Sequence, residues 1–239
     1  MIEYGSWLSF LYKLGVPGWI PDSLLISFFI MLCLCIAAFC LTRNLRPRNP
    51  GKPQIALEYI MKALMGFVDN LCPSEKKILR PVLGTTFLLI LFSNYIGIVP
   101  GFISPSSKVL FPVTMALMAF VFIQVMGFMR KGFGYLKHFV GEPVWLAPLN
   151  IPIHVIGEIA RPISLSCRLY GNIYGEEMVI CVLMYITLYV MGANIVPLRI
   201  IPLQLPMMLF GLFSGFIQAF IFTLLVGQYI SMAVSHEEE

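Results

Sequence analysis

The chain has 239 residues, of which 59% are hydrophobic and 12% are charged, and its formal net charge is +4. Soluble domains carry roughly twice that charged fraction, so the composition excludes an ordinary water-soluble protein. A helix needs about 20 apolar residues to cross a bilayer, and five uncharged runs are near or above this length: residues 24–42, 83–107, 109–129, 178–198 and 200–235. These runs do not alternate as barrel strands do. We therefore expect an all-α membrane protein with about five membrane-spanning helices.

The N-terminal part of the chain contains the first expected span. Residues 1–23 hold no basic stretch followed by a short apolar core, so we expect no cleavable signal peptide there. The run 24–42 is then retained as the first span. The basic residues that follow it are Arg43, Arg46, Arg48, Lys52, Lys62, Lys76, Lys77 and Arg80. By the positive-inside rule, the loop that they occupy is cytoplasmic and residues 1–23 lie outside. Because the basic residues follow membrane topology, we expect no nucleic-acid partner.

Within this cytoplasmic loop, residues 55–71 have the pattern of an amphipathic helix. Glu58, Lys62 and Asp69 fall within about 40° of one another on a helical wheel, and the other residues are mainly apolar. Such a segment suits a helix that lies in the membrane interface. A helix that packs on other subunits has the same pattern, and the sequence leaves both alternatives open.

Residues 83–129 are expected to form a helical hairpin that crosses the membrane outward and back. The hairpin is followed by Arg130, Lys131 and Lys137, which places its end in the cytoplasm. Two further crossings then return the C-terminus to the inside. The whole chain is expected to form a single integral membrane domain, residues 1–239.

Residues 145–234 are expected to form two long, tilted, antiparallel helices. As one helix, the run 200–235 would be about 54 Å long, whereas the hydrocarbon core of a bilayer is about 30 Å thick. A helix longer than the bilayer must tilt. The preceding segment has no strong loop signal and contains only Pro148, Pro152 and Pro162 as expected kinks.

Charged side chains lie in the middle of this apolar region. Arg161 and Arg168 share one helical face to within about 20°, while Glu177 lies on the opposite face and Glu176 about 80° from Arg168. An ionised group deep in a bilayer costs between about 2.5 and more than 10 kcal/mol, so these residues indicate a functional site. Structural alternatives stay open: Arg161 extending to the cytoplasmic interface, a buried ion pair for Arg168, and an outer interfacial position for Glu176.

The last expected helix carries a stripe of small residues with one amide. The stripe consists of Gly211, Ser214, Gly215 and Gln218. Such stripes let membrane helices approach closely, with the amide bonding across the gap. Antiparallel helices over about 150–190 and 200–234 have midpoints near 170 and 217. The helix lengths therefore predict that Arg168 and Gln218 meet at mid-membrane.

Other polar residues lie on both sides of that level. His154 and Glu158 precede Arg168 on the cytoplasmic side, and Asn94 lies in the outward half of its span. Acids on both sides of a fixed cation suggest two aqueous half-paths separated by a positive barrier, because arginine keeps its proton and does not relay it. His154 with Glu158 lacks a third ligand, so no metal or cofactor is expected. The six cysteines are expected to be small buried residues without disulfides.

Four segments carry a resemblance to a known family. They are RPISLSCRLYGNIYGEE (161–177), LLILFSNYIGIVPGF (88–102), WLAPLNIPIHVIGEIARP (145–162) and GLFSGFIQAFIFTLLVGQYISMA (211–233). In this order they resemble the a subunit of F-type ATP synthases, and the resemblance covers nearly all of the chain after about residue 50. The combination of the arginine motif with this last helix is specific to that family.

The resemblance implies roles for individual residues. Arg168 aligns with the family's indispensable arginine, and the other aligned residues are Arg161, Asn172, Glu177 (the acid of the outer half-channel) and Gln218. The expected ion path also includes Glu176 and Asn94, and on its inner side Glu158 and His154. Some members have a histidine that faces the outer acid, but this chain has Gly211 there. Its outer path must then rely on Glu177, water and neutral polar groups.

The resemblance further implies a non-catalytic, proton-translocating stator subunit that couples ion flow to rotation and ATP synthesis without a cofactor. Its implied partners are the rotating c-subunit ring, b-type peripheral-stalk subunits, the catalytic head reached through the complex, and the lipid bilayer. The expected location is the plasma (inner) membrane of a bacterium, with a plastid thylakoid membrane as the alternative. H⁺ or Na⁺ coupling and the ring size depend on another chain.

Two other classes compete with this interpretation. A free-standing transporter or channel would use Arg168 to bind an anionic substrate, and it would purify alone or as a homo-oligomer. A membrane-embedded hydrolase is less well supported, because the chain has no HExxH or GxSxG motif.

Overall fold

The computed structural model describes residues 21–43, 52–71, 76–99, 102–132, 134, 147–191 and 201–234. These residues form six long α-helices and two short 3₁₀ helices. The α-helices are α2 (Asp22–Arg43), α3 (Lys52–Leu71), α4 (Lys76–Tyr95), α5 (Leu110–Lys131), α7 (Ala147–Met191) and α8 (Ile201–Val234). The prediction of an all-α fold is confirmed, whereas the expectations for residues 1–20 lie outside the described part.

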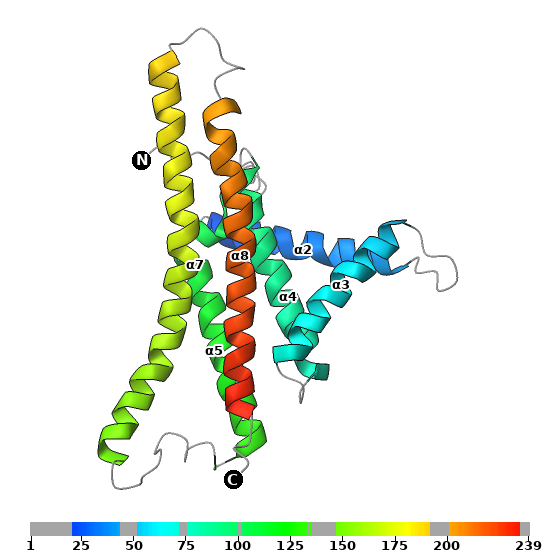
Figure 1. The fold of residues 1–239 in the computed structure, drawn as a ribbon, viewed down its shortest axis with the longest axis vertical. Helices are drawn as coiled ribbons and strands as arrows, with labels where there is room; N and C mark the ends of the chain where they lie inside the picture. The colour runs from blue at the N-terminus through cyan, green and yellow to red at the C-terminus, as the bar shows by residue number, and fades with distance from the viewer. Residues whose placement is uncertain are drawn as a thin grey trace.

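Helices α4, α5, α7 and α8 run side by side, and α2 lies across their direction (Figure 1). α8 contacts α3, α4, α5 and α7, so it is the central helix of the packing. The buried apolar core joins these helices and includes Leu83, Ile90, Leu169, Phe222 and Ile230. The core therefore holds α7 and α8, the two helices with the polar motifs, against the α4–α5 hairpin.

Four described helices are long and apolar enough to cross a membrane: Ser23–Cys40, Lys76–Ile98, Leu110–Lys131 and Leu205–Val234. The apolar pattern of the sequence predicted a fifth span within α7. α7 is long enough but is interrupted by Glu158, Arg161, Arg168, Glu176 and Glu177, which lower its apolar character. Its crossing of the membrane stays a prediction.

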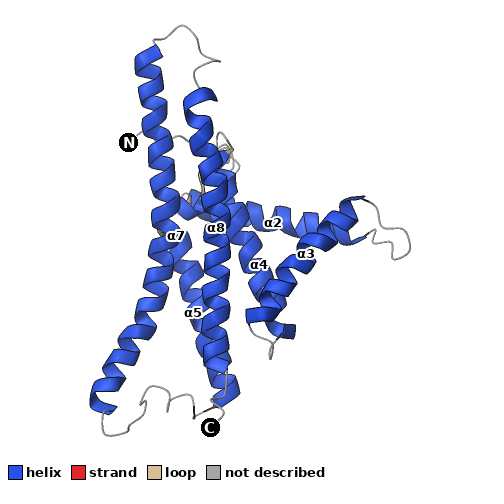
Figure 2. Cartoon of the chain, in the orientation of Figure 1, coloured by secondary structure: helices blue, strands red, loops and turns tan. Residues whose placement is uncertain are grey.

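The two long helices that the sequence predicted are α7, with 45 residues, and α8, with 34. α7 continues through Pro152 and Pro162, so neither proline breaks the helix. The N-terminal part of α7 bends away from α8 (Figure 2). Proline removes a backbone hydrogen bond and crowds the preceding turn, which accounts for a bend in this part.

The α4–α5 hairpin differs from its expected bounds. α4 begins at Lys76, seven residues before the expected start at 83, and it contains Pro81 in its first turns. The charge-based estimate began the helix only after the last basic residue, although basic side chains can stand on the end of a membrane helix and extend to the interface. Two 3₁₀ helices, η3 (Ile96–Ile98) and η4 (Pro105–Ser107), lie in the connection to α5.

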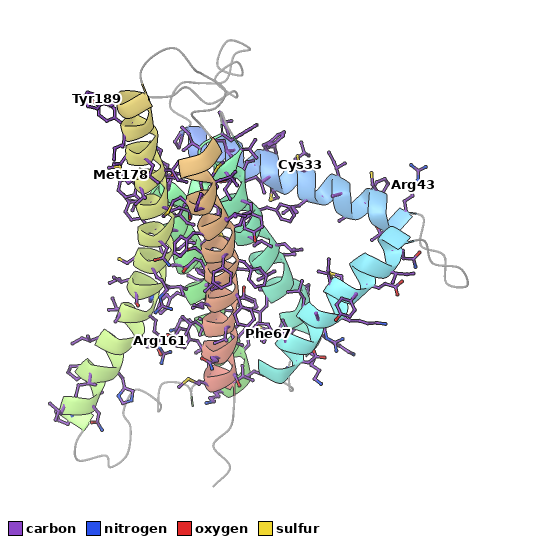
Figure 3. All side chains as sticks on the ribbon, turned by 45° about the horizontal axis from the view of Figure 1, so that its top comes forward. Cys33, Arg43, Phe67, Arg161, Met178 and Tyr189 are labelled. Atoms are coloured by element: carbon purple, nitrogen blue, oxygen red, sulfur yellow. The ribbon has the colours of Figure 1, made fainter. Side chains whose placement is uncertain are left out.

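α3 covers the amphipathic segment expected at 55–71 and packs on α4 and α8. Asp69 forms a two-point ion pair with Arg80 of α4, at 2.8 and 2.7 Å. Phe67 stacks on Phe220 of α8, with ring centroids 4.5 Å apart, and points toward α8 in Figure 3. The second half of α3 is thus fixed to this chain, while Tyr59 in its first half is 77% exposed.

Large apolar side chains cover much of the outer surface. Examples are Phe39 on α2, Met129 on α5 and Tyr189 on α7. Tyr189 is labelled near the end of α7 in Figure 3. Such extensive apolar exposure is expected where lipid or another subunit covers the chain. The five described cysteines, Cys33, Cys35, Cys40, Cys167 and Cys181, are free and also exposed. The expectation of buried cysteines is wrong for these five, because they stand on the outward faces of α2 and α7.

Candidate functional site

Three contacts set α7 and α8 side by side in antiparallel register. The guanidinium carbon of Arg161 lies 4.6 Å from the ring centroid of Tyr229. Further along α7, Asn172 Nδ2 donates to Gln218 Oε1 at 2.9 Å. One turn later the carboxyl group of Glu176 occupies the space beside Gly211. As residue numbers rise on α7 they fall on α8, so the polar residues of both helices meet along one seam.

Arg168 stands next to this seam but on the open side of α7. Its neighbours Leu165 and Leu169 are buried, with 5% and 0% of their surface exposed, whereas Arg168 itself is exposed. Within the described residues, no hydrogen bond or ion pair of Arg168 is present. A buried structural ion pair, the alternative considered for this residue, is therefore not found among them.

The predicted meeting of Arg168 with Gln218 is offset by one helical turn. Gln218 bonds to Asn172, which follows Arg168 by four residues on the same face of α7. Helix midpoints predicted a contact between residues 168 and 218, but side-chain contacts set the actual register. Gln218 has only 1% of its surface exposed, whereas Asn172 is exposed, so this hydrogen bond joins the interior of the α7–α8 seam to the open side of α7.

Glu177 lies at the connection between α4 and α5. Its carboxyl group lies near Ser104 and Ser107, and Lys108 is near enough to act on its charge. A Cβ added to Gly97 would lie 3.3 Å from Glu177 Oε1 and 2.8 Å from Ser104 Cβ. Glycine at 97 therefore lets the connection close around the carboxyl group. The sequence showed no sign that this serine-rich connection contacts Glu177.

Glu176 faces α8, and the sequence analysis did not identify its contact. Its carboxyl oxygens fill the volume that a side chain at Gly211 would need. An acid from α7 therefore takes the space beside Gly211. Asn172 and Glu176 lie one turn apart on α7, and they face Gln218 and Gly211 of α8. The four-residue spacing of Arg168, Asn172 and Glu176 along α7 was the available signal.

Asn94 approaches α8 from the other side. Its Nδ2 donates to the Gly215 carbonyl at 3.1 Å, and only 5% of its surface is exposed. The connection beyond it is held by the Ser104 hydroxyl, which donates to the Ser93 carbonyl at 2.8 Å. Polar groups of Glu177, of the connection and of Asn94 therefore follow one another between the α4–α5 connection and α8.

A second polar cluster lies toward the cytoplasmic end that the charge pattern predicts. Arg161 Nη1 is 2.5 Å from Glu158 Oε1, and Gln124 of α5 donates to Glu158 Oε2 at 3.0 Å. Both charged residues line a small, partly open pocket whose other lining includes Ile123, Leu165 and Tyr229. Arg161 is thus paired on its own helix and packed on α8, which differs from simple extension into the interface.

His154 lies on α7 one turn before Glu158. Its Nδ1 is 2.9 Å from the Asn150 carbonyl, and the side chain is half-buried. Across the described ranges, no three His, Cys, Asp or Glu side chains are grouped so that they could hold a metal ion. The site is made of single titratable groups and amides.

The fold and site define a helical membrane protein with an exposed arginine between two polar clusters. The family model for the ATP synthase A chain matches residues 24–231. The relatives include ATP synthase subunit a of Syntrophobacter fumaroxidans, 40% identical over 187 residues (78% of this chain, 74% of the relative), and that of Geobacter sulfurreducens, 34% identical over 234 residues (96% of each). ATP synthase subunit a 1 of Syntrophotalea carbinolica is 39% identical over 208 residues, covering 87% of this chain and 83% of the relative.

The chain belongs to the ATP synthase A chain family. It is a non-catalytic, proton-translocating stator subunit of the membrane sector, and it works within the ATP synthase complex. The predicted family is confirmed, and membership decides against a free-standing transporter and a hydrolase. The relatives named above are bacterial, which favours a bacterial membrane.

Proposed function

We propose that Arg168 is the fixed charge that faces the carboxyl groups of the rotating c-subunit ring. The observation that carries this proposal is its contrast with the other charged residues of α7. Glu158 and Arg161 pair with each other, and Glu176 and Glu177 are half-buried against α8 and the α4–α5 connection. Arg168 alone among these five is exposed, so its cation is available to a group on another chain.

The outer half-path leads from the α4–α5 connection to the seam beside Arg168. Glu177 receives the proton near Ser104 and Ser107, with Glu176 beside it as a second acid. Asn94, Gln218 and Asn172 supply neutral polar groups between these acids and the arginine. A ring carboxylate that takes up the proton becomes neutral, and it can then enter lipid without the desolvation cost of a charge.

The inner half-path begins at the second cluster. Glu158 and His154 receive the proton when a ring carboxyl arrives from the lipid side, and Arg161 balances the charge of Glu158. Arg168 attracts the resulting carboxylate and blocks direct proton flow between the two half-paths, because its guanidinium does not release its proton. Each charge that crosses supplies about 2.3 kcal/mol per 100 mV, so several crossings drive one ATP synthesis.

The orientation of α2 supports a strongly tilted α7–α8 pair. α2 is apolar and long enough to span, and it lies across the direction of α7 and α8 (Figure 1). If α2 stands along the membrane normal, the two long helices lie at a steep tilt, as their lengths require. The proposed topology has the N-terminus outside and the C-terminus in the cytoplasm of a bacterium. In it α7 crosses the membrane in addition to α2, α4, α5 and α8, and residues 1–239 form one membrane domain.

The proposed partners follow from this arrangement. The c-subunit ring covers the Arg168 face of α7, and b-type stalk helices cover apolar surface elsewhere, for which the exposed faces of α2 and α3 are available. Lipid covers the remaining apolar surface, and the catalytic head is reached through the rest of the complex.

ATP-driven acidification of inverted membrane vesicles tests the proposal. Arg168→Ala should abolish acidification while the complex still assembles, because the ring carboxylate loses its attracting charge. Cys167→Ala, a truncation at the neighbouring exposed position, is the matched control and should pump as the wild type does. Normal pumping by Arg168→Ala would show that this arginine is structural.

A further inference from the structure

Two buried amides in the described residues are incompletely hydrogen-bonded, and their free atoms are complementary. Asn94 Oδ1 is an acceptor without a donor, and Gln218 Nε2 is a donor without an acceptor. An unpaired buried polar group costs free energy and calls for an explanation. Asn94 contacts α8 at Gly215, and Gln218 stands three residues further along α8, within one helical turn of that contact. The two free atoms are not bonded to each other in this structure.

Asn94 reaches the backbone of α8 only because residue 215 is glycine. A Cβ added to Gly215 would lie 3.1 Å from Asn94 Cβ and 3.4 Å from the ring of Tyr95. The first distance is shorter than ordinary packing allows, so α4 approaches the backbone of α8 closely here. The hydrogen bond from Asn94 Nδ2 to the Gly215 carbonyl fixes the amide at this point of approach.

Gln218 connects the same place to α7. Its Oε1 accepts the hydrogen bond from Asn172, and Asn172 stands one turn after Arg168 on the same helix face. Arg168 itself is exposed and has no polar partner within the described part of the chain. The height and rotation of its helical turn are therefore set by the contacts of its neighbours.

We propose that Asn94 is a positioning residue for Arg168, a role that rests on the proposed function of this arginine. Asn94, Gln218 and Asn172 form a chain of amides through α4, α8 and α7, which is completed when Gln218 Nε2 donates to Asn94 Oδ1. The chain holds the turn of α7 that carries Arg168 at one height and rotation relative to α8. Small errors in the position of a charged group reduce the rate of a reaction strongly.

A positioning residue and a residue that only lines the outer path have different effects on coupling. In a tightly coupled motor, a blocked proton path stops the rotor, so ATP hydrolysis falls together with proton pumping. A misplaced Arg168 instead lets the ring slip, so hydrolysis continues while pumping falls. The ratio of acidification to hydrolysis therefore separates the two roles.

The test uses the whole complex in inverted vesicles, with Asn94→Leu, Gln218→Leu and the double variant. Ser93→Ala, in the same turn of α4, is the matched control, because it removes a neighbouring buried hydroxyl that has no partner. We expect each single variant to lower acidification about tenfold while ATP hydrolysis stays within about twofold of the wild type. The double variant should pump no less than the more impaired of the two single variants, because both amides belong to one chain.

Three results would overturn the proposal. They are hydrolysis that falls in parallel with pumping, losses of pumping that multiply in the double variant, and wild-type pumping and hydrolysis in both single variants. If Asn94→Leu does not assemble, Gln218→Leu decides by the same ratio. Normal pumping by Arg168→Ala would overturn the function proposed for the arginine itself. Loss of pumping in Arg168→Ala with parallel losses in Asn94→Leu would overturn only the positioning role.

Discussion

Glu158 and Arg161, one turn apart on α7, form an ion pair of 2.5 Å between α5 and α8. Glu158 has 7% of its surface exposed, and its second carboxylate oxygen accepts from Gln124. The guanidinium group of Arg161 in turn lies over the ring of Tyr229. The pair on α7 therefore contacts side chains of both α5 and α8.

Removing Arg161 should destabilise the protein, because a buried carboxylate would lose its partner. Breaking a buried pair from one side costs about 3–5 kcal/mol, whereas replacing both members can be nearly neutral. We expect Arg161→Ala to lower the thermal midpoint of the detergent-purified complex, and Glu158→Gln combined with Arg161→Ala to recover most of the loss. A double variant that is less stable than Arg161→Ala would show that the pair does not hold these helices.

Gly211→Ala should disturb the α7–α8 seam, since the added methyl group would collide with the Glu176 carboxyl group. The Glu176 carboxyl group is the end of a flexible side chain and can rotate away. The cost should therefore lie near the low end of the about 1–3 kcal/mol of overpacking, and it should cancel most of the gain of roughly 1 kcal/mol that alanine brings to a helix interior. Adding Glu176→Ala should restore the stability of the complex by removing the colliding group.

Gly84→Ala is the matched control for this prediction. Gly84 is also inside a helix, but a Cβ there would meet nothing within 4 Å. It should therefore keep the gain in helix propensity and raise stability slightly. Equal effects of the two substitutions would contradict a specific contact between Glu176 and position 211.

The attachment of α3 to α4 should weaken at acid pH. The hydrogen bond from Arg80 holds the pKa of Asp69 below its ordinary value of 3.8, with the charges of Arg80 and Lys76 acting in the same direction against desolvation. Because the folded-state pKa is lowered, the stabilisation is complete above the ordinary value and is lost as pH falls through the folded-state pKa.

Hydrogen exchange of α3 amides in wild type and Asp69→Asn measures this contribution. From pH 8 to pH 5 the α3 amides of the wild type should exchange more slowly than those of Asp69→Asn, by a constant factor. The exchange rates of the two proteins should become equal only below pH 3.8. Since the pair is exposed to solvent, the factor should be small and should decrease with added salt. A difference that changes between pH 8 and pH 5 would point to a different titrating group.

Fold class and the long helices were predictable because they depend on the lengths of apolar runs. The start of α4 at Lys76 was not, because basic residues at a membrane surface can belong to a helix or a loop. The register of α7 on α8 was predicted to within one turn from lengths, but Gly211 and Glu176 show that local shape sets it.

Contacts between distant segments were the least predictable part of the site. Nothing in the sequence near Glu177 indicates the serine-rich connection at Ser104–Ser107, and Tyr229 looked like one more aromatic residue of a membrane helix. The titratable residues were identified because charge in an apolar run is costly and therefore noticeable. Their neutral partners were missed. A serine or tyrosine in a membrane helix costs little free energy, so its presence does not by itself indicate a functional role.

Glu177→Gln should reduce proton pumping more than any change to the groups around it. The substitution keeps the shape of the side chain near Ser104 and Ser107 but removes its ability to bind and release a proton. A positioned proton-transfer group contributes about 100-fold or more to a rate, so acidification by inverted vesicles should fall by at least about that factor. Ser107→Ala removes only one neighbouring hydroxyl and should cost no more than about tenfold. With equal amounts of assembled complex, wild-type pumping by Glu177→Gln would mean that the proton enters elsewhere, and Glu176 would be the next residue to substitute.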